Sequence, residues 1–456
     1  MSRKFFGTDG IRGLANQFPM TADVAMNLGR ALVAHFPRRG SVFRALIGKD
    51  TRRSGYMFES ALAAGINAMN GDVLLTGPMP TPAIAHLTQA MRCDVGVVIS
   101  ASHNPYCDNG IKIFSRTGFK LPDAVEASIE QALCEPSTLD AMMSPEHIGR
   151  SRRIDDALGR YNAFVKSHFE RDLTLEGLRI VVDCAHGAAY KIAPTVLAEL
   201  GADVIVSGVE PNGYNINDGV GALYPEHCAR LVRECGADMG ITLDGDADRL
   251  ILVDEKGNIV DGDFVMAILA VDLHERHALQ NDTLVTTVMS NLGLRLAMEA
   301  HGIRVIQTDV GDRYVVEEML RGGYNLGGEQ SGHIVMFDHS TTGDGLLAAL
   351  RILSAMRRCG KPLSELATVM SKLPQVLVNL RVDRKIPLPE LKQTSALIAD
   401  IEQCYGTTGR VLVRYSGTEP KCRIMLEGPD LEVLRRDANA IAALVTRETQ
   451  SHVEPV

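Results

Sequence analysis

Short apolar runs that end in polar loops recur three times along the chain. The run at 46–52 leads into a helical pattern at 56–69, and further runs follow at 72–75 and 95–99. The same order returns as strands at 180–182, 203–206 and 239–243 with a helix near 189–200, and again as strands at 283–288, 304–307 and 324–326 with a helix near 292–301. Strands that alternate with helices are typical of parallel or mixed sheets covered by helices. The pattern therefore predicts a weak threefold repeat of α/β units.

Each copy carries a different polar motif directly after its third strand. The three motifs are Ser100-Ala101-Ser102-His103-Asn104-Pro105, Asp244-Gly245-Asp246-Ala247-Asp248-Arg249 and Gly327-Gly328-Glu329-Gln330-Ser331-Gly332-His333. Open α/β sheets bind their ligands outside the carboxyl ends of the strands. We therefore expect the three loops to point into one cleft.

The last part of the chain departs from this pattern. Strand-like runs at 376–380, 410–414 and 422–426 accompany two amphipathic helices, one at 389–404 with Pro389 in its first turn and one at 429–448. This order predicts an α+β lid domain. We thus expect an α/β protein with three similar mixed-sheet α/β domains and a C-terminal α+β lid domain around a central cleft, with domains at 1–154, 155–254, 255–371 and 372–456.

Composition narrows the class of protein. The 456 residues are 45% hydrophobic and 23% charged with a net charge of −9, which fits several globular domains. No basic stretch suggests a nucleic-acid partner, and no uncharged apolar stretch is long enough to span a bilayer. The nine cysteines form no CxxC pair, which favours reduced thiols over a disulfide framework or a zinc site. With no signal peptide recognisable, we expect a cytoplasmic protein that binds neither nucleic acid nor membranes.

The loop at Ser100–Pro105 brings hydroxyls and an imidazole to the end of a continuous apolar strand. Its Asn-Pro pair restrains the backbone, because the residue before proline avoids the helical region. Ser102, with His103 beside it, suits phosphoryl chemistry, although an ordinary polar turn explains the loop taken alone. Lys112 follows ten residues after Ser102, where a hairpin could fold it back over the serine; an exposed strand lysine is the alternative.

Three carboxylates alternate along Asp244, Asp246 and Asp248. Closely spaced carboxylates repel one another unless a hard cation lies among them. A solvated acidic turn fits poorly between the apolar runs at 241–243 and 250–253, and an EF-hand loop is excluded because Arg249 stands where that loop needs glycine. We expect one divalent ion per chain, Mg²⁺ rather than Ca²⁺, with Arg249 balancing anionic charge.

Further stretches offer groups for a phosphorylated sugar. Glu329 and Ser331 can bracket vicinal hydroxyls, and His333 adds a titratable ring, although a polar turn with a surface histidine fits equally well in isolation. Hydroxyls, a Gly-freed amide and arginines predict an anion site at Arg414, Ser416, Gly417, Thr418 and Arg423; a hairpin turn with solvent-facing arginines is the alternative. The Gly-rich stretch 6–13 brings Arg12 within reach of an anion.

Five stretches, in this order, resemble the α-D-phosphohexomutase superfamily across essentially the whole chain: Phe6–Gly13, Ser100–Pro105, Asp244–Arg249, Gly328–His333 and Arg414–Pro420. The stretches at 3–13, 310–315 and 328–333 are most similar to its branch acting on glucosamine phosphates. The resemblance implies a phosphoserine at Ser102, Mg²⁺ held by that phosphate with Asp244, Asp246 and Asp248, sugar contacts from Glu329 and Ser331, and a phosphate site at Arg414, Ser416, Gly417, Thr418 and Arg423. The expected catalytic set is Ser102, Lys112, His103, Arg12, Arg249 and His333, and Lys112 and His333 match positions with acid/base or proton-handling roles in relatives. Ala247 stands where many members have glycine, which we expect to be tolerated if the backbone there is ordinary.

The implied reaction moves a phosphate between two oxygens of one sugar. Ser102-phosphate would donate to the C1 hydroxyl of glucosamine 6-phosphate, and the 1,6-bisphosphate would turn end for end and return its C6 phosphate to Ser102. Glucosamine 1-phosphate would leave and feed UDP-N-acetylglucosamine and cell-wall precursor synthesis. Glucosamine or glucose 1,6-bisphosphate would prime the enzyme, whose partner is a small-molecule hexosamine phosphate and whose assembly is a dimer at most. Such transfer relies mainly on positioning and charge stabilisation.

The same residues are compatible with three alternative functions. Mannose or glucose phosphates are the nearest alternative substrates, because Glu329 and Ser331 would contact hydroxyls that these sugars share. A metal-dependent sugar phosphatase would use an aspartate of the acidic triplet as nucleophile and form an acid-labile acyl phosphate. A catalytically silent sugar-phosphate sensor would interconvert no hexose phosphate. Phosphopeptide mapping and a coupled mutase assay separate these cases.

Overall fold

The computed structural model describes residues 5–7, 9–36, 42–140, 143–415 and 421–449. These residues form two compact units, one within Met1–Met289 and His301–Val369 and the other within Ser290–Ala300 and Met370–Val456. None of the described helices combines the length and the apolar character needed to cross a bilayer.

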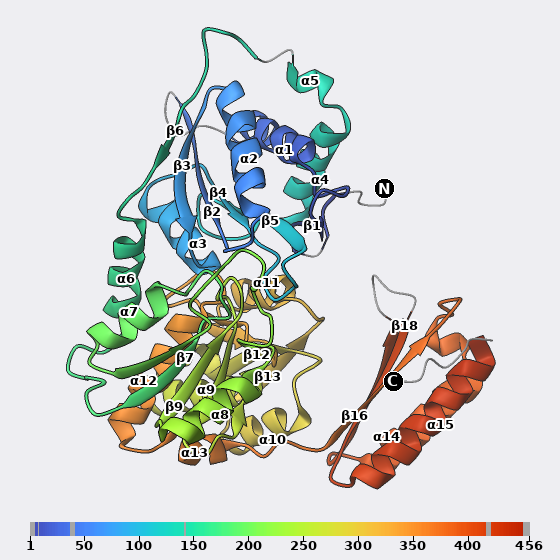
Figure 1. Cartoon of the computed structure of the whole chain (residues 1–456). Helices are drawn as coiled ribbons and strands as arrows, with labels where there is room; N and C mark the ends of the chain where they lie inside the picture. Colours follow the sequence, from blue (N-terminus) through green and yellow to red (C-terminus); the bar gives the residue numbers. More distant parts are fainter. Residues whose placement is uncertain (1–4, 8, 37–41, 141–142, 416–420, 450–456) are drawn as a thin grey trace. The chain divides into compact units, whose positions relative to one another are not determined.

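The first sheet of the larger unit has six strands in the order β1-β5-β4-β2-β3-β6 (Figure 1). Its strands are β1 (Ile11–Leu14), β2 (Phe43–Lys49), β3 (Gly71–Pro78), β4 (Val95–Ile99), β5 (Asp108–Ser115) and β6 (Ser151–Arg153). The associated helices are α1 (Ala22–His35), α2 (Gly55–Ala68), α3 (Thr81–Ala90), α4 (Asp123–Cys134) and α5 (Ser137–Asp140). Strands β2, β3, β4 and β6 run parallel, whereas β1 and β5 pair antiparallel.

Two further sheets follow in the same unit. The second has the order β11-β10-β9-β7-β8, and the third β13-β12-β14-β15. The second comprises β7 (Arg179–Asp183), β8 (Asp203–Ser207), β9 (Met239–Leu243), β10 (Leu250–Asp254) and β11 (Ile259–Val260), with α6 (Ala157–Ser167), α7 (Ile192–Glu199) and α8 (Pro225–Cys235). The third comprises β12 (Thr283–Thr287), β13 (Arg304–Thr308), β14 (Leu326–Gly328) and β15 (Ile334–Met336), with α9 (Gly262–Glu275), α11 (Asp312–Gly322), α12 (Gly345–Cys359) and α13 (Leu363–Leu366).

The three sheets share one arrangement of four strands. Counted along the chain, the first strand is central, and the second and third strands pair with it in parallel, one on each side. The fourth strand pairs antiparallel with the third. The resulting orders within the sheets are β3-β2-β4-β5, β8-β7-β9-β10 and β13-β12-β14-β15. Each polar motif is therefore the tip of a hairpin between the third and fourth strands. The predicted α/β repeat with mixed sheets is confirmed.

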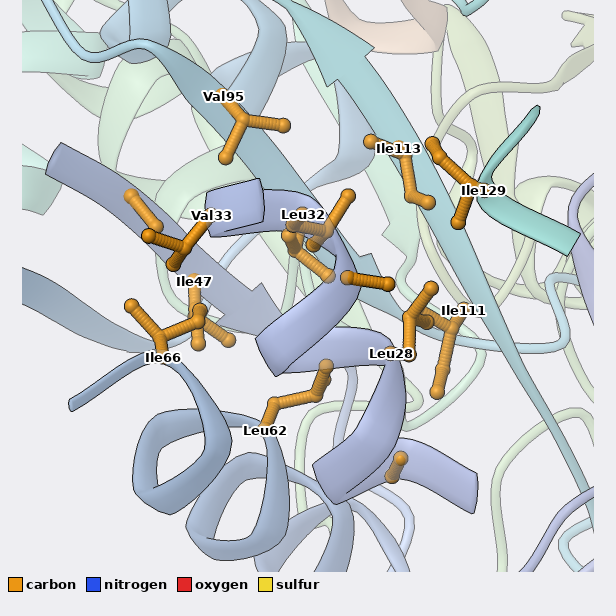
Figure 2. Packing of buried hydrophobic residues seen from close by; sticks show 14 of the residues in the cluster. Leu28, Leu32, Val33, Ile47, Leu62, Ile66, Val95, Ile111, Ile113 and Ile129 are labelled. Carbon is orange, nitrogen blue, oxygen red and sulfur yellow. The ribbon is translucent and has the colours of Figure 1, made fainter. Parts of the chain in front are cut away.

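The core of the first sheet explains why its third strand is a continuous apolar run. All five residues of β4 are buried, and Val95 lies in a cluster with Leu28 and Leu32 of α1 and Leu62 of α2 (Figure 2). Helices α1 and α2 pack closely, since a Cβ on Gly65 would lie 2.0 Å from the carbonyl oxygen of Met26. A strand covered on both faces is a rigid base for the loop that follows it.

The smaller unit is an antiparallel sheet with helices. Its sheet has the order β16-β18-β17, from β16 (Gln375–Arg381), β17 (Arg410–Tyr415) and β18 (Lys421–Glu427), with α14 (Lys392–Tyr405) and α15 (Leu431–Thr449). The predicted α+β character is confirmed. Pro389 lies in a 3₁₀ turn at Leu388–Glu390, and α14 begins only at Lys392, so the prediction that Pro389 occupies the first turn of this helix is wrong.

The helix predicted near 292–301 is present as α10 (Leu292–Ala300), and it belongs to the smaller unit. Glu427, fully buried at the end of β18, accepts hydrogen bonds from the Leu292 amide at 3.1 Å and from Asn291 Nδ2 at 3.2 Å. The same carboxylate pairs with Arg410 at 2.7 Å. A buried carboxylate needs such partners, and here they attach a helix N-terminus to a strand more than a hundred residues later.

The N-terminus of α12 provides a stability test in the larger unit. Asp344 caps this helix by accepting from the Leu347 amide at 3.0 Å, and Tyr161 of α6 donates to it at 2.8 Å. Burial raises the pKa of Asp344 to about 6, against ordinary values near 3.9 in unfolded chains. The folded state therefore favours the protonated form, and the stability that this group contributes is lost as pH rises from about 4 through about 6.

We expect Asp344→Asn to gain stability relative to the wild type as pH rises from about 4 to about 7, by about 2–3 kcal/mol. Thermal unfolding of both proteins across this range, with the exposed Asp218→Asn as control, measures the difference. A difference in Tm that does not change with pH would contradict the assignment.

Candidate active site

The three hairpin tips meet within the larger unit. Ser102 Oγ, after β4, donates to Asp244 Oδ2, after β9, at 2.6 Å. The backbone of Arg249 forms an antiparallel bridge with His333, which follows β14. Residues of hairpins that are far apart in the sequence thus lie in direct contact, as expected if each sheet presents its third-strand loop to the same place.

Ser102 is buried and has an unusual backbone. Its φ of 52° lies in the left-handed region, which costs a residue with a side chain about 1–2 kcal/mol. The hydroxyl lies 3.3 Å from His103 Nδ1 as well as next to Asp244. Burial, together with the charges of Arg249 and Arg12, lowers the pKa of His103 to about 4. His103 is therefore a neutral imidazole beside the serine hydroxyl at pH 7.

The three aspartates form a compact buried acidic triplet. Asp244, Asp246 and Asp248 each present a carboxylate oxygen such that all three oxygens lie within 4.8 Å of one another. Burial, with the charges of Asp248 and Asp246, raises the pKa of Asp244 to about 8. Within the described part of the chain, Asp246 Oδ1 and Asp248 Oδ1 are buried without a hydrogen-bond partner. Oxygen ligands at this spacing, with unpaired atoms, fit a hard divalent cation such as Mg²⁺.

Ala247, between two of these aspartates, has φ 59°. The condition under which alanine was expected to be tolerated, an ordinary backbone, is therefore not met, since the backbone is left-handed. Alanine is held there by the surrounding loop: its amide donates to the Asp244 carbonyl at 3.1 Å, and its carbonyl accepts from Gly345 at 3.0 Å. These bonds offset a conformational cost that glycine would avoid.

Lys112 is buried against the acidic triplet. In the β4–β5 hairpin it lies opposite Val98, and its Nζ donates to Asp246 at 2.8 Å and to Asp248 at 3.2 Å. Burial opposes its charge, but Asp246, Asp248 and Asp9 raise the pKa of Lys112 well above the ordinary value. The hairpin does return this lysine to the serine loop, and the alternative of an exposed strand lysine is excluded.

Two arginines add positive charge. Arg12 forms an ion pair with Asp9. Burial lowers the pKa of Arg12, but the negative charges of Asp9, Asp246 and Asp248 outweigh this effect, so the pKa of Arg12 is raised. The Arg249 amide donates to Asp244 Oδ1 at 3.2 Å. Its side-chain Nε is buried and has no hydrogen-bond partner among the described residues. Arg249 is thus suited to receive an anionic group of a ligand.

The third hairpin tip contributes Glu329, Ser331 and His333. Glu329 accepts from the Gly311 amide at 3.2 Å, and its pKa is raised by burial although His333 and Arg249 oppose the shift. Ser331 Oγ is buried and makes no hydrogen bond to any described residue. The ring of His333 lies 3.7 Å from Asp248 and 3.4 Å from Asp312. A carboxylate and an unused hydroxyl on one loop suit the recognition of a ligand with hydroxyl groups.

Sequence reasoning did not assign four further residues that join this site. Asp9 lies 3.5 Å from Lys112 and 2.5 Å from Lys120, and Lys120 also pairs with Asp312. Thr81 donates to Asp246 Oδ2 at 2.7 Å. Asp9 belongs to the glycine-rich stretch near the N-terminus, and Thr81 and Asp312 begin α3 and α11 directly after proline- or glycine-containing loops, which is a usable signal. Lys120 carries no such signal.

The expected phosphate site belongs to the smaller unit. Arg414 and Arg423 lie directly opposite one another on β17 and β18. Ser416, Gly417 and Thr418 lie outside the described residues. This site therefore stays a prediction that rests on the sequence and on the facing arginines.

Comparisons with known protein families cover most of the chain. Residues 3–139, 160–257 and 261–373 match the models of phosphoglucomutase/phosphomannomutase alpha/beta/alpha domains I, II and III, and residues 377–444 match the model of the C-terminal domain. The domain limits at 154, 254 and 371 stay a prediction.

Curated relatives and solved structures are similar to this chain and have names from the same family. Phosphoglucosamine mutases of Geobacter sp. (strain M21) and Geotalea daltonii are 57% and 58% identical to this chain, with 98% of each chain covered. A phosphoglucomutase/phosphomannomutase family protein from Burkholderia thailandensis has a TM-score of 0.81 at 22% identity, with 99% of both chains covered. The N-acetylphosphoglucosamine mutase of Aspergillus fumigatus, in complex with GlcNAc-6P and magnesium, has a TM-score of 0.62 at 17% identity, covering 93% of this chain and 99% of that one. The chain therefore belongs to the phosphoglucomutase/phosphomannomutase family, within which the two curated relatives named above are phosphoglucosamine mutases.

Proposed function

We propose that this protein is a phosphoglucosamine mutase, an isomerase that interconverts glucosamine 6-phosphate and glucosamine 1-phosphate through a phosphoserine at Ser102. The observation that carries the proposal is the 2.6 Å contact between Ser102 Oγ and Asp244 within the buried acidic triplet. A serine hydroxyl beside clustered carboxylates is an unfavourable place for an anion unless a cation is added. It is a suitable place for a phosphate that shares a cation with them.

The acidic triplet would hold Mg²⁺ together with the phosphate on Ser102. Bound there, the ion would neutralise charge on the phosphoryl group during transfer. The magnesium complex of the Aspergillus fumigatus protein supports this choice of ion. In this proposal the ammonium group of Lys112 supplies positive charge beside the acidic triplet. The guanidinium groups of Arg249 and Arg12 supply positive charge that stabilises the oxygens of the phosphoryl group during transfer. Acid/base and proton-handling roles for Lys112 and His333 remain part of the proposal.

Two transfers would complete one turnover. In the first, the C1 hydroxyl oxygen of glucosamine 6-phosphate bonds to phosphorus, the bond from phosphorus to Ser102 Oγ breaks, and the hydroxyl proton returns to the serine oxygen. In the second, Ser102 Oγ bonds to the phosphorus of the C6 phosphate in the reoriented 1,6-bisphosphate, the bond from that phosphorus to the C6 oxygen breaks, and the serine proton passes to the C6 oxygen. Glu329 and Ser331 would hold the sugar hydroxyls in both orientations. The second phosphate would rest on Arg414, Arg423 and the loop with Ser416, Gly417 and Thr418.

The cellular setting is part of the same proposal. The nine cysteines are all described and all free, which supports a reducing, cytoplasmic environment. Glucosamine 1-phosphate would serve UDP-N-acetylglucosamine synthesis. The dimer suggested by the resemblance stays a prediction for sedimentation analysis.

Comparing the 1- and 6-phosphates of glucosamine, glucose and mannose tests the substrate assignment. We expect kcat/KM for the glucosamine phosphates to exceed the other values by about tenfold or more, because a protonated amino group carries three donors and a positive charge, whereas the hydroxyl that replaces it carries one donor and no charge. Equal values for glucose or mannose phosphates would move the protein to the phosphoglucomutase or phosphomannomutase activity.

A further inference from the structure

The loop that carries Ser102 is held from behind by one buried arginine. Arg52, three residues after β2, is fully buried. Its Nη2 donates to the carbonyl oxygens of Ser102 at 2.9 Å and Asn104 at 2.7 Å. Its Nη1 donates to the carbonyl oxygens of Asp108 at 3.1 Å and of Pro105. A guanidinium can reach several carbonyls of one loop because its donors form a rigid planar fork.

Asp50 completes this arrangement. Its carboxylate accepts from Arg52 Nε at 2.8 Å, so that all five guanidinium N–H donors have an acceptor. The same carboxylate accepts from Ser100 Oγ at 2.6 Å, and Ser100 Oγ accepts from the Ser102 amide at 2.9 Å. Both the amide and the carbonyl of Ser102 are thereby tied to the Asp50–Arg52 pair.

The loop that carries Ser102 is also held by a residue of the segment between β8 and α8. Asn217, also buried, donates from Nδ2 to the Ser102 carbonyl at 2.9 Å and to the Asn104 carbonyl at 3.1 Å. Gly245 lies against the same carbonyl, because a Cβ there would be 2.5 Å from the oxygen of Ser102. The Ser102 carbonyl is thus enclosed by groups attached to two different sheets.

These contacts fix the feature on which the chemistry depends. Ser102 keeps a left-handed backbone with φ 52°, and this conformation aims its hydroxyl at Asp244, 2.6 Å away. Neither Arg52 nor Asn217 makes a described hydrogen bond to the acidic triplet. A displacement of about 1 Å at a reacting atom can lower a rate about 10²-fold without altering binding.

We infer that Arg52 and Asn217 are positioning residues for phosphoryl transfer, which hold the backbone of Ser102 in the conformation that presents its oxygen to the acidic triplet. The inference rests on the proposed function, because it takes Ser102 as the phosphate carrier. It predicts an effect on the transfer step and little effect on sugar binding or metal binding.

The test uses Arg52→Lys and Asn217→Ala in the full-length protein. Lysine keeps the charge but places its donors on one atom, so it cannot serve four carbonyls, and we expect kcat to fall about 10²-fold. Asn217→Ala removes two hydrogen bonds from the loop, and we expect kcat to fall about tenfold. In both variants KM for glucosamine 6-phosphate and Kd for Mn²⁺ should stay within about threefold of the wild type.

Arg351→Lys is the matched control. Arg351 of α12 is another buried arginine, and it donates to the His168 carbonyl at 3.3 Å rather than to the serine loop. We expect this variant to lower Tm while kcat stays at the wild-type value. If Arg52→Lys does not fold, Asn217→Ala carries the test alone, since it removes a smaller group and no charge.

Single-turnover transfer from the phosphorylated enzyme to glucosamine 6-phosphate separates the outcomes. A slower transfer with unchanged KM and Kd, in folded variants, supports positioning. Transfer at the wild-type rate in folded Asn217→Ala and Arg52→Lys overturns the inference while leaving the proposed function intact. Phosphate mapped on the wild type at a residue other than Ser102 overturns the proposed function before any variant is compared.

Discussion

Ser102→Ala is expected to lower kcat about 10³-fold or more, because it removes the oxygen that receives and returns the phosphate. The change deletes one buried hydroxyl, whose described partners are Asp244 and His103, and leaves the acidic triplet in place. Mutase activity should therefore disappear while Tm and Mn²⁺ binding persist. A coupled assay for glucosamine 1-phosphate, with the exposed Ser60→Ala as control, measures the loss.

Residual activity above about a tenth of the wild type would contradict a phosphoserine at this position, since a carrier residue cannot be bypassed so easily. Such a result, combined with an acid-labile phosphate on the acidic triplet, would instead favour the phosphatase alternative. Loss of activity together with loss of folding would be recognised from Tm and would call for Ser102→Gly, because glycine accepts the left-handed backbone at this position and still removes the oxygen.

Asp246→Asn is expected to have the second largest effect. Asp246 receives Thr81 and Lys112 on one oxygen, and its other oxygen is buried without a partner among the described residues. An amide keeps the shape but removes one of three negative charges, so Mn²⁺ binding should weaken at least about tenfold and kcat should fall about 10²-fold or more. Titration with Mn²⁺ followed by electron paramagnetic resonance measures binding independently of turnover.

Asp218→Asn serves as the exposed carboxylate control and should bind Mn²⁺ like the wild type. Unchanged Mn²⁺ affinity in Asp246→Asn would show that the triplet holds no ion. In that case the burial of three carboxylates would have to be balanced by Lys112 and the two arginines alone.

The strand pattern predicted most of the fold because the signal is local. Continuous apolar runs such as Val95–Ile99 identified strands buried on both faces, and the polar residues after them identified the hairpin tips. The common strand order of the three sheets then accounts for the meeting of Ser102 with Asp244. The start of α14 was misplaced because proline is favoured both in the first turn of a helix and in the 3₁₀ turn that precedes this one.

The partners of buried charges could not be predicted in the same way. Lys112 occupies a strand position that is usually exposed, and its acceptors Asp246 and Asp248 lie more than 130 residues away. The role of Arg52 was not predicted at all, because the carbonyl groups that accept its hydrogen bonds lie 50–56 residues later and carry no side-chain signature. The backbone conformation of Ala247 could not be predicted for another reason, since sequence alone does not show a left-handed φ at a residue other than glycine.

Following the phosphate itself tests the central claim most directly. The purified protein, phosphorylated with isotope-labelled glucose 1,6-bisphosphate, is mapped by mass spectrometry before and after one turnover with unlabelled glucosamine 6-phosphate. We predict acid-stable labelled phosphate on Ser102 that leaves with glucosamine 1-phosphate, while unlabelled phosphate from C6 replaces it on Ser102. Phosphate that is absent from Ser102, or labelled phosphate that stays on it while glucosamine 1-phosphate accumulates, would contradict the account.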